Sequence, residues 1–320
     1  MRALLPLSCV VLVGCSPAAL AEAERGGTGP IALRIVTWNV HDLFDEIDRT
    51  ASPGEEDDVP SPAEVEGKLA RVGRVLHELD ADVLVLQEVE NAALLERLAA
   101  GQLPGGGYRA VLREGHDPRG IDVGVLARVP FSVGPTHLED RAPDGRLLWS
   151  RDVLEIHVDL GTRPVVLLGA HLVSRVDAGE DERRRLQAAR LRQLADEVHA
   201  GSTATAVLIV GDLNDVPGSE SLAPLLEDGA FVDLAARQGR EGVWTWSGGG
   251  AQERLDYALV DAAHRSLVTR VAVQVGADVT AASDHRPVVV DLWGGSVPGA
   301  VNGRRPGPFG ALETANGRSR

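Results

Sequence analysis

Carboxylates, amides and imidazoles stand at the ends of short apolar segments in this sequence of 320 residues. Each segment has the length and apolar content of a buried β-strand. The groups at their ends are Asn39, Glu88, His171, Asp212 with Asn214, Asp256, and Asp284 with His285. One polar residue at a strand end is most simply a cap or a turn residue. So many in one chain indicate a shared site, because strand ends meet at one edge of a sheet.

These residue types fit the metal-assisted hydrolysis of a phosphoester. Carboxylate and amide oxygens are hard ligands that suit Mg²⁺, Mn²⁺ or Ca²⁺. Histidine transfers protons or hydrogen-bonds phosphate near neutral pH, and arginine binds phosphate through two donors. The sequence contains no nucleophilic serine elbow, Walker loop or dinucleotide fingerprint that would indicate another reaction.

The apolar segments predict the strands that position these groups. We expect strands at Leu33–Asn39, Asp82–Glu88, Ile121–Ala127, Asp152–Val158, Val165–His171, Ala206–Asp212, Leu255–Val260 and Pro287–Leu292. Helical patterns separate several of them, which predicts a single α/β domain over residues 31–293.

Two helices are predicted between the strands. Ser61 and Glu64 have the spacing of a capping box, and apolar residues follow at helical spacing up to Leu79. The second helix is expected over residues 182–199. We interpret its arginines as a solvated face, and these are Arg183, Arg184, Arg185, Arg190 and Arg192.

The first 30 residues predict export. Residues 1–15 form a signal peptide with an apolar core, and Leu12–Cys15 resembles a lipobox, in which the cysteine is lipidated. The predicted location is therefore the cell envelope, with a lipid anchor to the membrane at Cys15. The alternative is a secretory signal cut near Ala19 or Ala21, which would give a secreted protein. Residues 16–30 are interpreted as a flexible tether, and residues 294–320 as a disordered tail.

Composition limits the function further. The net charge is −15, from 32 Lys and Arg against 47 Asp and Glu. A protein that coats nucleic acid by counterion release would normally be basic, so that class is disfavoured. Both cysteines, Cys9 and Cys15, lie in the leader. The predicted domain therefore has neither a disulfide nor a thiolate zinc site.

The order of the motifs resembles the endonuclease/exonuclease/phosphatase superfamily, the DNase-I-like group. The motifs are Thr37-Trp38-Asn39-Val40, Leu86-Gln87-Glu88-Val89, Gly211-Asp212-Leu213-Asn214-Asp215, Arg254-Leu255-Asp256-Tyr257 and Ser283-Asp284-His285-Arg286-Pro287. Three further segments are similar to a bacterial exported branch, and they are residues 119–123, 171–175 and 243–246. The resemblance implies a four-layer αββα sandwich of two mixed sheets.

The same resemblance implies roles for the matched residues. Glu88 resembles the main metal ligand, with Asn39 and Asp284 beside it, and Asn39 also lies next to the substrate phosphate. Arg119 resembles a phosphate-binding arginine. Arg175 either binds phosphate or caps a helix.

The resemblance also implies catalytic roles. Asp212 resembles the carboxylate that orients or deprotonates the attacking water, with Asn214 as its partner on the phosphate or the metal. His285 resembles the imidazole that contacts the scissile phosphate, and Asp256 the carboxylate that orients it. His171 resembles a general acid for the leaving group. The pattern leaves open which group is the base and which the acid.

One position departs from the family. Many members have Glu or Asp two residues after the Asn of the first motif, whereas this chain has His41, followed by Asp42. His41 is either a ligand for a metal, a phosphate contact or a neutral loop residue. The tryptophans Trp149, Trp244 and Trp246 are expected to pack in the core or at its rim rather than to line a groove.

These features predict an exported, divalent-metal-dependent phosphodiesterase, a nuclease that hydrolyses DNA or RNA with an activated water. The expected cofactor is Mg²⁺, with Mn²⁺ or Ca²⁺ as alternatives. A phospholipase or phosphatase of the same fold, sphingomyelinase-like or acting on inositol phosphates, is the runner-up, with phospholipid as its partner. A third reading is an inactive surface-binding module. Nothing in the sequence requires more than a monomer.

Overall fold

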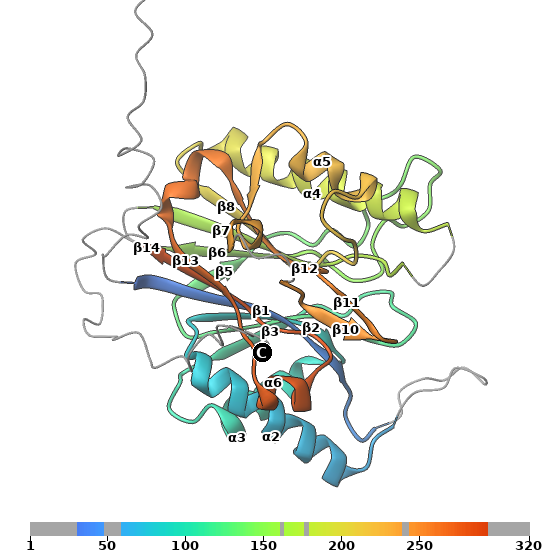
Figure 1. Ribbon diagram of the computed structural model, residues 1–320, viewed down its shortest axis with the longest axis vertical. Helices are drawn as coiled ribbons and strands as arrows, with labels where there is room; N and C mark the ends of the chain where they lie inside the picture. Colours follow the sequence, from blue (N-terminus) through green and yellow to red (C-terminus); the bar gives the residue numbers. More distant parts are fainter. Residues whose placement is uncertain (1–30, 48–58, 161–162, 176–178, 239–242, 294–320) are drawn as a thin grey trace, which may run out of the picture.

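Two six-stranded β-sheets pack face to face in the computed structural model, and helices cover their outer faces (Figure 1). The structure describes residues 31–47, 59–160, 163–175, 179–238 and 243–293. The four layers confirm the predicted αββα sandwich. The predicted signal peptide, tether and tail (1–30 and 294–320) lie outside the described residues.

The first sheet has the strand order β13-β14-β1-β2-β4-β3. Its strands are β13 (Val268–Val273), β14 (Val288–Trp293), β1 (Ile31–Leu43), β2 (Val83–Val89), β4 (Asp122–Ala127) and β3 (Arg109–Leu112). β1 and β2 run parallel, and the other neighbours pair antiparallel.

The second sheet has the order β5-β6-β7-β8-β12-β9, with β7 and β8 parallel. Its strands are β5 (Phe131–Val133), β6 (Leu154–Asp159), β7 (Pro164–His171), β8 (Ala206–Asp212), β12 (Asp256–Asp261) and β9 (Phe231–Asp233). A separate hairpin joins β10 (Trp246–Gly248) to β11 (Ala251–Glu253). Each sheet therefore contains one parallel pair whose carboxyl ends lie at the same edge.

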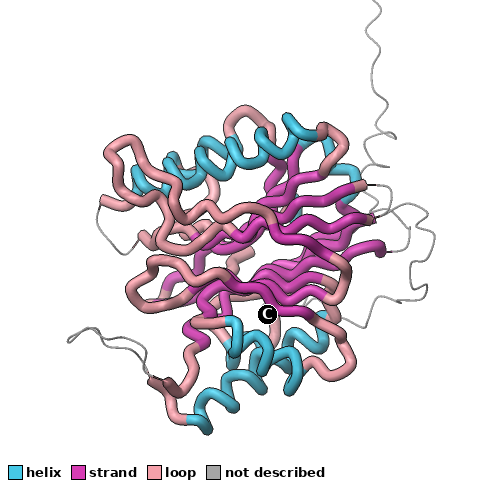
Figure 2. Tube along the Cα trace, turned by 180° about the vertical axis from the view of Figure 1, so that it is seen from behind, coloured by secondary structure: helices cyan, strands magenta, loops and turns pink. Residues whose placement is uncertain are grey.

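The helices divide between the two outer faces, as Figures 1 and 2 show. Helices α2 (Pro62–Leu79), α3 (Ala92–Gln102) and α6 (Ala277–Ala282) cover the first sheet, and α4 (Asp181–Gly201) and α5 (Ala223–Leu226) cover the second. Short 3₁₀ helices follow at η1 (Glu220–Leu222), η2 (Ala235–Gln238) and η3 (Ala262–Leu267). Among the residues that the structure describes, no helix combines the length and apolar character needed to cross a bilayer.

The predicted capping box starts α2. The hydroxyl of Ser61 accepts a hydrogen bond from the N–H of Glu64 (3.4 Å), whose carboxylate accepts from the N–H of Ser61 (2.8 Å). The helix then buries its apolar stripe, from Val65 to Leu79, against the outer face of the first sheet.

Strand alternation builds the core between the sheets. In β1, Leu33 and Ile35 face the second sheet, whereas Val36 and Trp38 face the helices. All four side chains are fully buried, because both faces of the strand are covered. The predicted strands are all present. The sequence analysis did not identify the helices α3, α5 and α6 or the strands β3, β5, β9, β10, β11 and β13.

Candidate active site

The sequence predicts that strand β1 ends at Asn39, but the strand continues to Leu43. Its pairing with β2 loses register between those two residues. The pairing of β2 with β4 loses register at the same edge, between Gln87 and Val89. Such bulges re-aim side chains. The polar residues of both motifs therefore lie on distorted strand segments, not beyond strand ends.

Left-handed backbone gathers at this edge. His41, Asp42, Glu88 and Asn214 have φ values of 55°, 54°, 63° and 52°. Among the described non-glycine residues, one other has a positive φ, and it is Asp80 at the C-cap of α2. Residues with a side chain rarely adopt this conformation, and those that do concentrate at functional sites. The strain marks this edge as the candidate site.

Asn39 connects the two sheets. Its Nδ2 donates to Glu88 Oε1 (2.9 Å) in the first sheet and to Asp212 Oδ2 (3.0 Å) in the second. Its Oδ1 accepts from the N–H of His41 (2.9 Å), which holds the amide in place. The side chain is fully buried. Asn39 therefore fixes the distance between the two carboxylates.

The β7–β8 pair brings His171 opposite Asp212. Between the strands, Gly211 has φ 140°, and a Cβ there would lie 1.9 Å from the carbonyl oxygen of Ala170. This close approach requires glycine. Asp212 Oδ1 then accepts from the N–H of Asn214 (2.9 Å), so Oδ2 is the carboxylate oxygen that faces the site.

The loop before β14 carries His285. The hydroxyl of Ser283 donates to the carbonyl of Asn39 (2.8 Å) and accepts from the N–H of His285 (2.9 Å). Nδ1 of His285 lies 2.8 Å from Asp256 Oδ2, and this carboxylate belongs to the neighbouring β12. The N–H of Asp256 donates to the hydroxyl of Thr245 (2.9 Å). The imidazole is thereby fixed with its Nε2 toward the site.

Three groups converge on Asp212 Oδ2. Besides the amide of Asn39, His171 Nε2 lies 3.7 Å away and His285 Nε2 lies 3.8 Å away. Both imidazoles are too distant for a direct hydrogen bond. An oxygen atom of water or phosphate beside Asp212 is within reach of both imidazoles.

The protonation states of Asp212, His285 and His171 differ. Burial raises the pKa of Asp212 to about 7, and the nearby charge of Asp256 adds to the effect. Burial would lower the pKa of His285, but the charge of Asp256 and the hydrogen bond to it raise that pKa to about 10. Burial, with the charges of Arg151 and His285, holds the pKa of His171 well below its ordinary value. Near neutral pH the site therefore pairs an imidazolium with a neutral imidazole.

His41 and Asp284 form the other side of the site. His41 Nδ1 lies 2.9 Å from Asp284 Oδ1, and this hydrogen bond raises the pKa of His41. Burial would raise the pKa of Asp284, but the hydrogen bonds from His41 and Trp246 and the charges of His285 and His41 together lower that pKa. Trp246 Nε1 donates to Asp284 Oδ2 (2.9 Å). The sequence analysis expected packing from this tryptophan and missed its contact with a site carboxylate.

The donor set fits a divalent cation. Burial raises the pKa of Glu88, and the neighbouring Asp42 raises it further, so anionic groups crowd together here. Asn39, Glu88 and Asp284 offer oxygen donors at this edge, which is the chemistry of Mg²⁺ or Mn²⁺ sites. The buried cluster of Asp212, Asp256 and His285 also brings potential ligand atoms together. In this cluster Nδ1 of His285 already contacts Asp256 (2.8 Å) and cannot also bind a metal.

The two predicted phosphate-binding arginines lie at the rim in ion pairs. Arg119 pairs with Asp42 and lies near the ring of Phe44. Arg175 pairs with Glu253 of β11 and does not cap a helix in the structure. Both side chains are partly exposed, so each can exchange its partner for a phosphate. Their roles stay predictions.

Arg184 corrects the predicted solvated face of α4. It is fully buried, with Nε 3.0 Å from Asp215 Oδ2 and a second ion pair to Asp181. Its Nη1 also donates to the carbonyls of Val173 and Ser174 (both 3.3 Å). The guanidinium thus ties α4 to both loops that follow β7 and β8. The other arginines of the run are at least partly exposed, as expected.

Arg184→Gln is expected to lower the free energy of unfolding by about 3 kcal/mol, because it leaves Asp215 buried without its cation. Arg185→Gln is the matched control, since Arg185 pairs with the exposed Glu182 one position along the same helix. That change should cost less than about 0.5 kcal/mol. Urea unfolding of both variants measures the difference. Equal losses would mean that the buried pair has no special weight.

Asp122 predicts a pH dependence of stability. Its carboxylate accepts from the N–H of Gly115 (3.1 Å), and burial raises its pKa to about 7. The folded protein therefore holds this proton more tightly than the unfolded chain. The stabilisation is complete below about pH 4 and is lost as pH rises through about 7. Asp122→Asn should reduce the loss of unfolding free energy between pH 5 and pH 8 by about 1–3 kcal/mol. Urea unfolding at both pH values tests this, and an unchanged loss would contradict it.

A second His/Asp cluster lies at the far end of β12. It comprises Asp261, His264 and His199. Asp261 accepts from the N–H of His264 (3.1 Å) as the N-cap of η3, and from its Nδ1 (2.8 Å). It also accepts from the N–H of Val207 (2.8 Å). These bonds account for the cluster as the cap that ends the strand.

Comparison with known proteins places these motifs in a family. The profile of the Endonuclease/Exonuclease/phosphatase family matches residues 36–285, which include the Asn39, Glu88, Asp212, Asp256 and His285 positions. No curated protein matches the chain.

Solved structures share the fold. Truncated TDP2 from Caenorhabditis elegans is similar with a TM-score of 0.57 and 17% identity, over 82% of this chain and 97% of that chain. An endonuclease/exonuclease/phosphatase protein from Beutenbergia cavernae is 25% identical, with a TM-score of 0.53 over 84% of this chain and 72% of that chain. The 3' phosphatase NExo from Neisseria, bound to a product DNA hairpin, is 20% identical with a TM-score of 0.53, over 81% of this chain and 99% of that chain.

Proposed function

Because the chain belongs to the Endonuclease/Exonuclease/phosphatase family of phosphoester hydrolases, we propose that it is a divalent-metal-dependent phosphodiesterase, specifically a nuclease that hydrolyses DNA or RNA. The observation that carries this proposal is the convergence of Asn39, His171 and His285 on one oxygen of Asp212. Hydrolysis of a phosphoester needs an acceptor for the proton of the attacking water and hydrogen-bond donors for the phosphate oxygens, and this arrangement brings both kinds of group together.

Asp212 is the proposed base. Its Oδ2 faces the site, and its pKa of about 7 lets it accept a proton from water near neutral pH. The amide of Asn39 (3.0 Å) fixes the position of this oxygen. A divalent cation held by Glu88, Asn39 and Asp284 would supply positive charge that neutralises the phosphate and favours attack by water.

His285 is the proposed phosphate contact. Asp256 holds it as a cation, so its Nε2–H presents a charged donor to the phosphate oxygen. Negative charge that builds up on the phosphate in the transition state strengthens this hydrogen bond.

His171 is the proposed donor to the leaving oxygen. Burial keeps it neutral in the free protein, where its Nε2 lies 3.7 Å from Asp212 Oδ2. A bound phosphate brings negative charge to the imidazole and raises its pKa, which favours the protonated form that an acid needs. His171 therefore becomes a proton donor once the substrate is bound.

A nucleic acid is favoured over a lipid by the related structures. NExo from Neisseria and TDP2 from D. rerio were both solved with product DNA. The chain is acidic overall, so a metal ion and the local arginines would have to carry the attraction to phosphate.

Hydrolysis assays with the purified protein test the proposal. Plasmid DNA, RNA, sphingomyelin and a phosphomonoester are each incubated with Mg²⁺, Mn²⁺, Ca²⁺ or EDTA, beside an Asp212→Asn, His285→Gln double variant. Metal-dependent cleavage of DNA or RNA, absent with EDTA and in the variant, supports a nuclease. Turnover of lipid or monoester with intact nucleic acid would move the protein to the phospholipase or phosphatase class. No turnover of any substrate would favour the surface-binding module.

We further propose that the protein is an exported envelope lipoprotein anchored at Cys15. The support is the apolar run that precedes Leu12-Val13-Gly14-Cys15. A lipid at the cysteine would hold the catalytic domain on a tether of residues 16–30.

Cys15→Ser is expected to move the protein from the membrane fraction to the soluble envelope or medium, because serine does not accept the lipid. Fractionation of a bacterial host and mass spectrometry of the mature N-terminus measure the change. Cys9→Ser is the matched control and should leave the protein in the membrane fraction. A mature N-terminus near Ala19 or Ala21 in the wild type would instead indicate a secreted protein.

A further inference from the structure

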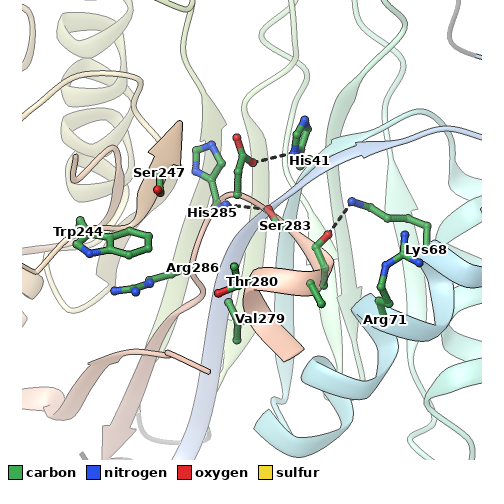
Figure 3. Close-up of a pocket in the computed structure, with 13 residues that line it drawn as sticks. His41, Lys68, Arg71, Trp244, Ser247, Val279, Thr280, Ser283, His285 and Arg286 are labelled. Carbon is green, nitrogen blue, oxygen red and sulfur yellow. Dashed lines mark hydrogen bonds and ion pairs between the residues drawn. The ribbon is translucent and has the colours of Figure 1, made fainter. Parts of the chain in front are cut away.

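A basic pocket opens directly beside the catalytic histidine. Its volume is about 400 Å³, and its wall runs from His41 and His285 to helices α2 and α6 (Figure 3). Three cations line it, and they are Lys68, Arg71 and Arg286; its one carboxylate, Asp284, already contacts His41 (2.9 Å). The proposed mechanism assigns no role to any of these three cations.

The three cations have no carboxylate partner within the described parts of the chain. This contrasts with Arg119 and Arg175 at the same rim, which are both in ion pairs. It also contrasts with Arg74, one turn beyond Arg71 on α2, which pairs with Asp278 (2.8 Å). In a chain with net charge −15, a pocket that gathers unpaired cations is a site for an anion.

Arg286 is held ready for such an anion. Its guanidinium lies over the ring of Trp244, with Cζ 3.0 Å from the ring centre. The side chain is half-buried. A half-buried charge without a counter-charge is unfavourable, so binding an anion there would stabilise it. The stacked ring leaves the edge donors of the guanidinium free for a bidentate contact.

Lys68 faces the pocket from the opposite wall. One of its three N–H donors is used by the carbonyl of Ala282 (2.7 Å), which fixes the ammonium at the base of α6. Burial, together with the charge of Arg71, lowers its pKa to about 8. An anion in the pocket would favour the charged form.

We propose that this pocket binds the phosphate next to the scissile phosphate on the same nucleic acid strand. This inference rests on the proposed nuclease function. His285 and Arg286 both line this pocket, so a strand with a phosphate at His285 can place the next phosphate at Arg286 (Figure 3). A substrate with consecutive phosphates would fill both positions. The enzyme would therefore prefer a strand with at least two phosphates over an isolated phosphodiester.

Dinucleotides test this preference. The wild type and Arg286→Gln are given a dinucleotide with one internal phosphodiester, and the same dinucleotide with an added 5'-phosphate or 3'-phosphate. For the wild type, one added phosphate should raise kcat/KM by about tenfold or more, mainly through KM, as a charge-assisted contact provides. Arg286→Gln should bring this ratio close to one. Lys68→Gln, an independent variant from the other wall, should also reduce it.

Arg74→Gln is the matched control, and it should keep the wild-type ratio because Arg74 lies outside the pocket. A second readout needs no turnover: in EDTA, a fluorescent oligothymidine should bind Arg286→Gln more weakly than the wild type, with a shallower salt dependence. If the wild type and Arg286→Gln hydrolyse the dinucleotides with the same ratio of kcat/KM with and without the added phosphate, the pocket does not bind that phosphate. This inference is then wrong, whereas the proposed nuclease function still stands. If the wild type hydrolyses no nucleotide, the proposed function fails with it.

Discussion

Asp212→Asn is expected to lower kcat by about 10³-fold or more while the protein remains folded, because it removes the proposed base without changing the side-chain shape. The asparagine oxygen can still accept the hydrogen bond from Asn39 that now reaches Asp212 Oδ2 (3.0 Å), although its NH2 group then replaces the oxygen that accepts from the N–H of Asn214 (2.9 Å). It cannot accept a proton from water. Initial rates of plasmid or RNA cleavage at saturating metal measure the loss, and circular dichroism verifies the fold.

The stability of this variant separates a lost base from a damaged site. The pKa of Asp212 is raised to about 7, so folding favours its neutral form and disfavours the carboxylate above that pH. At pH 8 the relief of the buried charge should offset the lost hydrogen bond from the N–H of Asn214, so the neutral Asp212→Asn variant should unfold in urea within about 1 kcal/mol of the wild type. Low activity with stability in this range supports catalysis by Asp212. Activity within tenfold of the wild type would assign the base to another group.

The motif residues were predictable because each lies in a short, locally ordered segment. Asn39, Glu88, Asp212 and His285 follow or precede apolar strands, and that local pattern is enough to find them. The capping box at Ser61 was predictable for the same reason, since helix signals span a few residues. The structure then adds how the side chains meet, which no local pattern contains.

The residues that the sequence analysis missed act across long separations. Arg184 is one of several arginines on α4, and its burial depends on Asp215, which is 31 residues away. Trp246 reaches Asp284 across 38 residues, and Thr245 caps the backbone of Asp256 from a neighbouring loop. Helical periodicity alone groups Arg184 with the exposed arginines, because it contains no information on which face of the helix packs against a distant loop.

Two other differences from the predicted elements have separate causes. The bulge after Asn39 extends β1, although His41 and Asp42 are left-handed residues that read as the end of a strand. Helix α3 has a usable signal, the N-cap Asn91 whose side chain accepts from the N–H of Leu94 (3.0 Å). That signal alone does not predict a helix, because Asn is equally common in the turns that follow strands.

Asp256→Asn and His285→Gln are expected to be strongly non-additive. Asp256 is fully buried and contacts the site through His285, with Oδ2 2.8 Å from Nδ1. Removing its charge takes away the largest effect that raises the pKa of His285 and leaves only Asp212 and Asp284 to oppose burial, so the pKa falls and the positive charge that faces the phosphate is weakened. Each single variant should lower kcat by about 10²-fold to 10³-fold. The double variant should be no slower than His285→Gln alone, because Asp256 then has nothing left to position.

Asp261→Asn is the matched control for this cycle. Asp261 is a buried carboxylate at the other end of the same strand β12, with its own histidine, His264, at 2.8 Å. Its replacement should lower stability, since it caps η3, but should leave kcat within about twofold. A double variant of Asp256 and His285 whose losses multiply would show that Asp256 acts on catalysis independently of His285. The comparison of two Asp–His pairs on one strand therefore distinguishes the positioning of a catalytic imidazolium from the general cost of disturbing a buried ion pair.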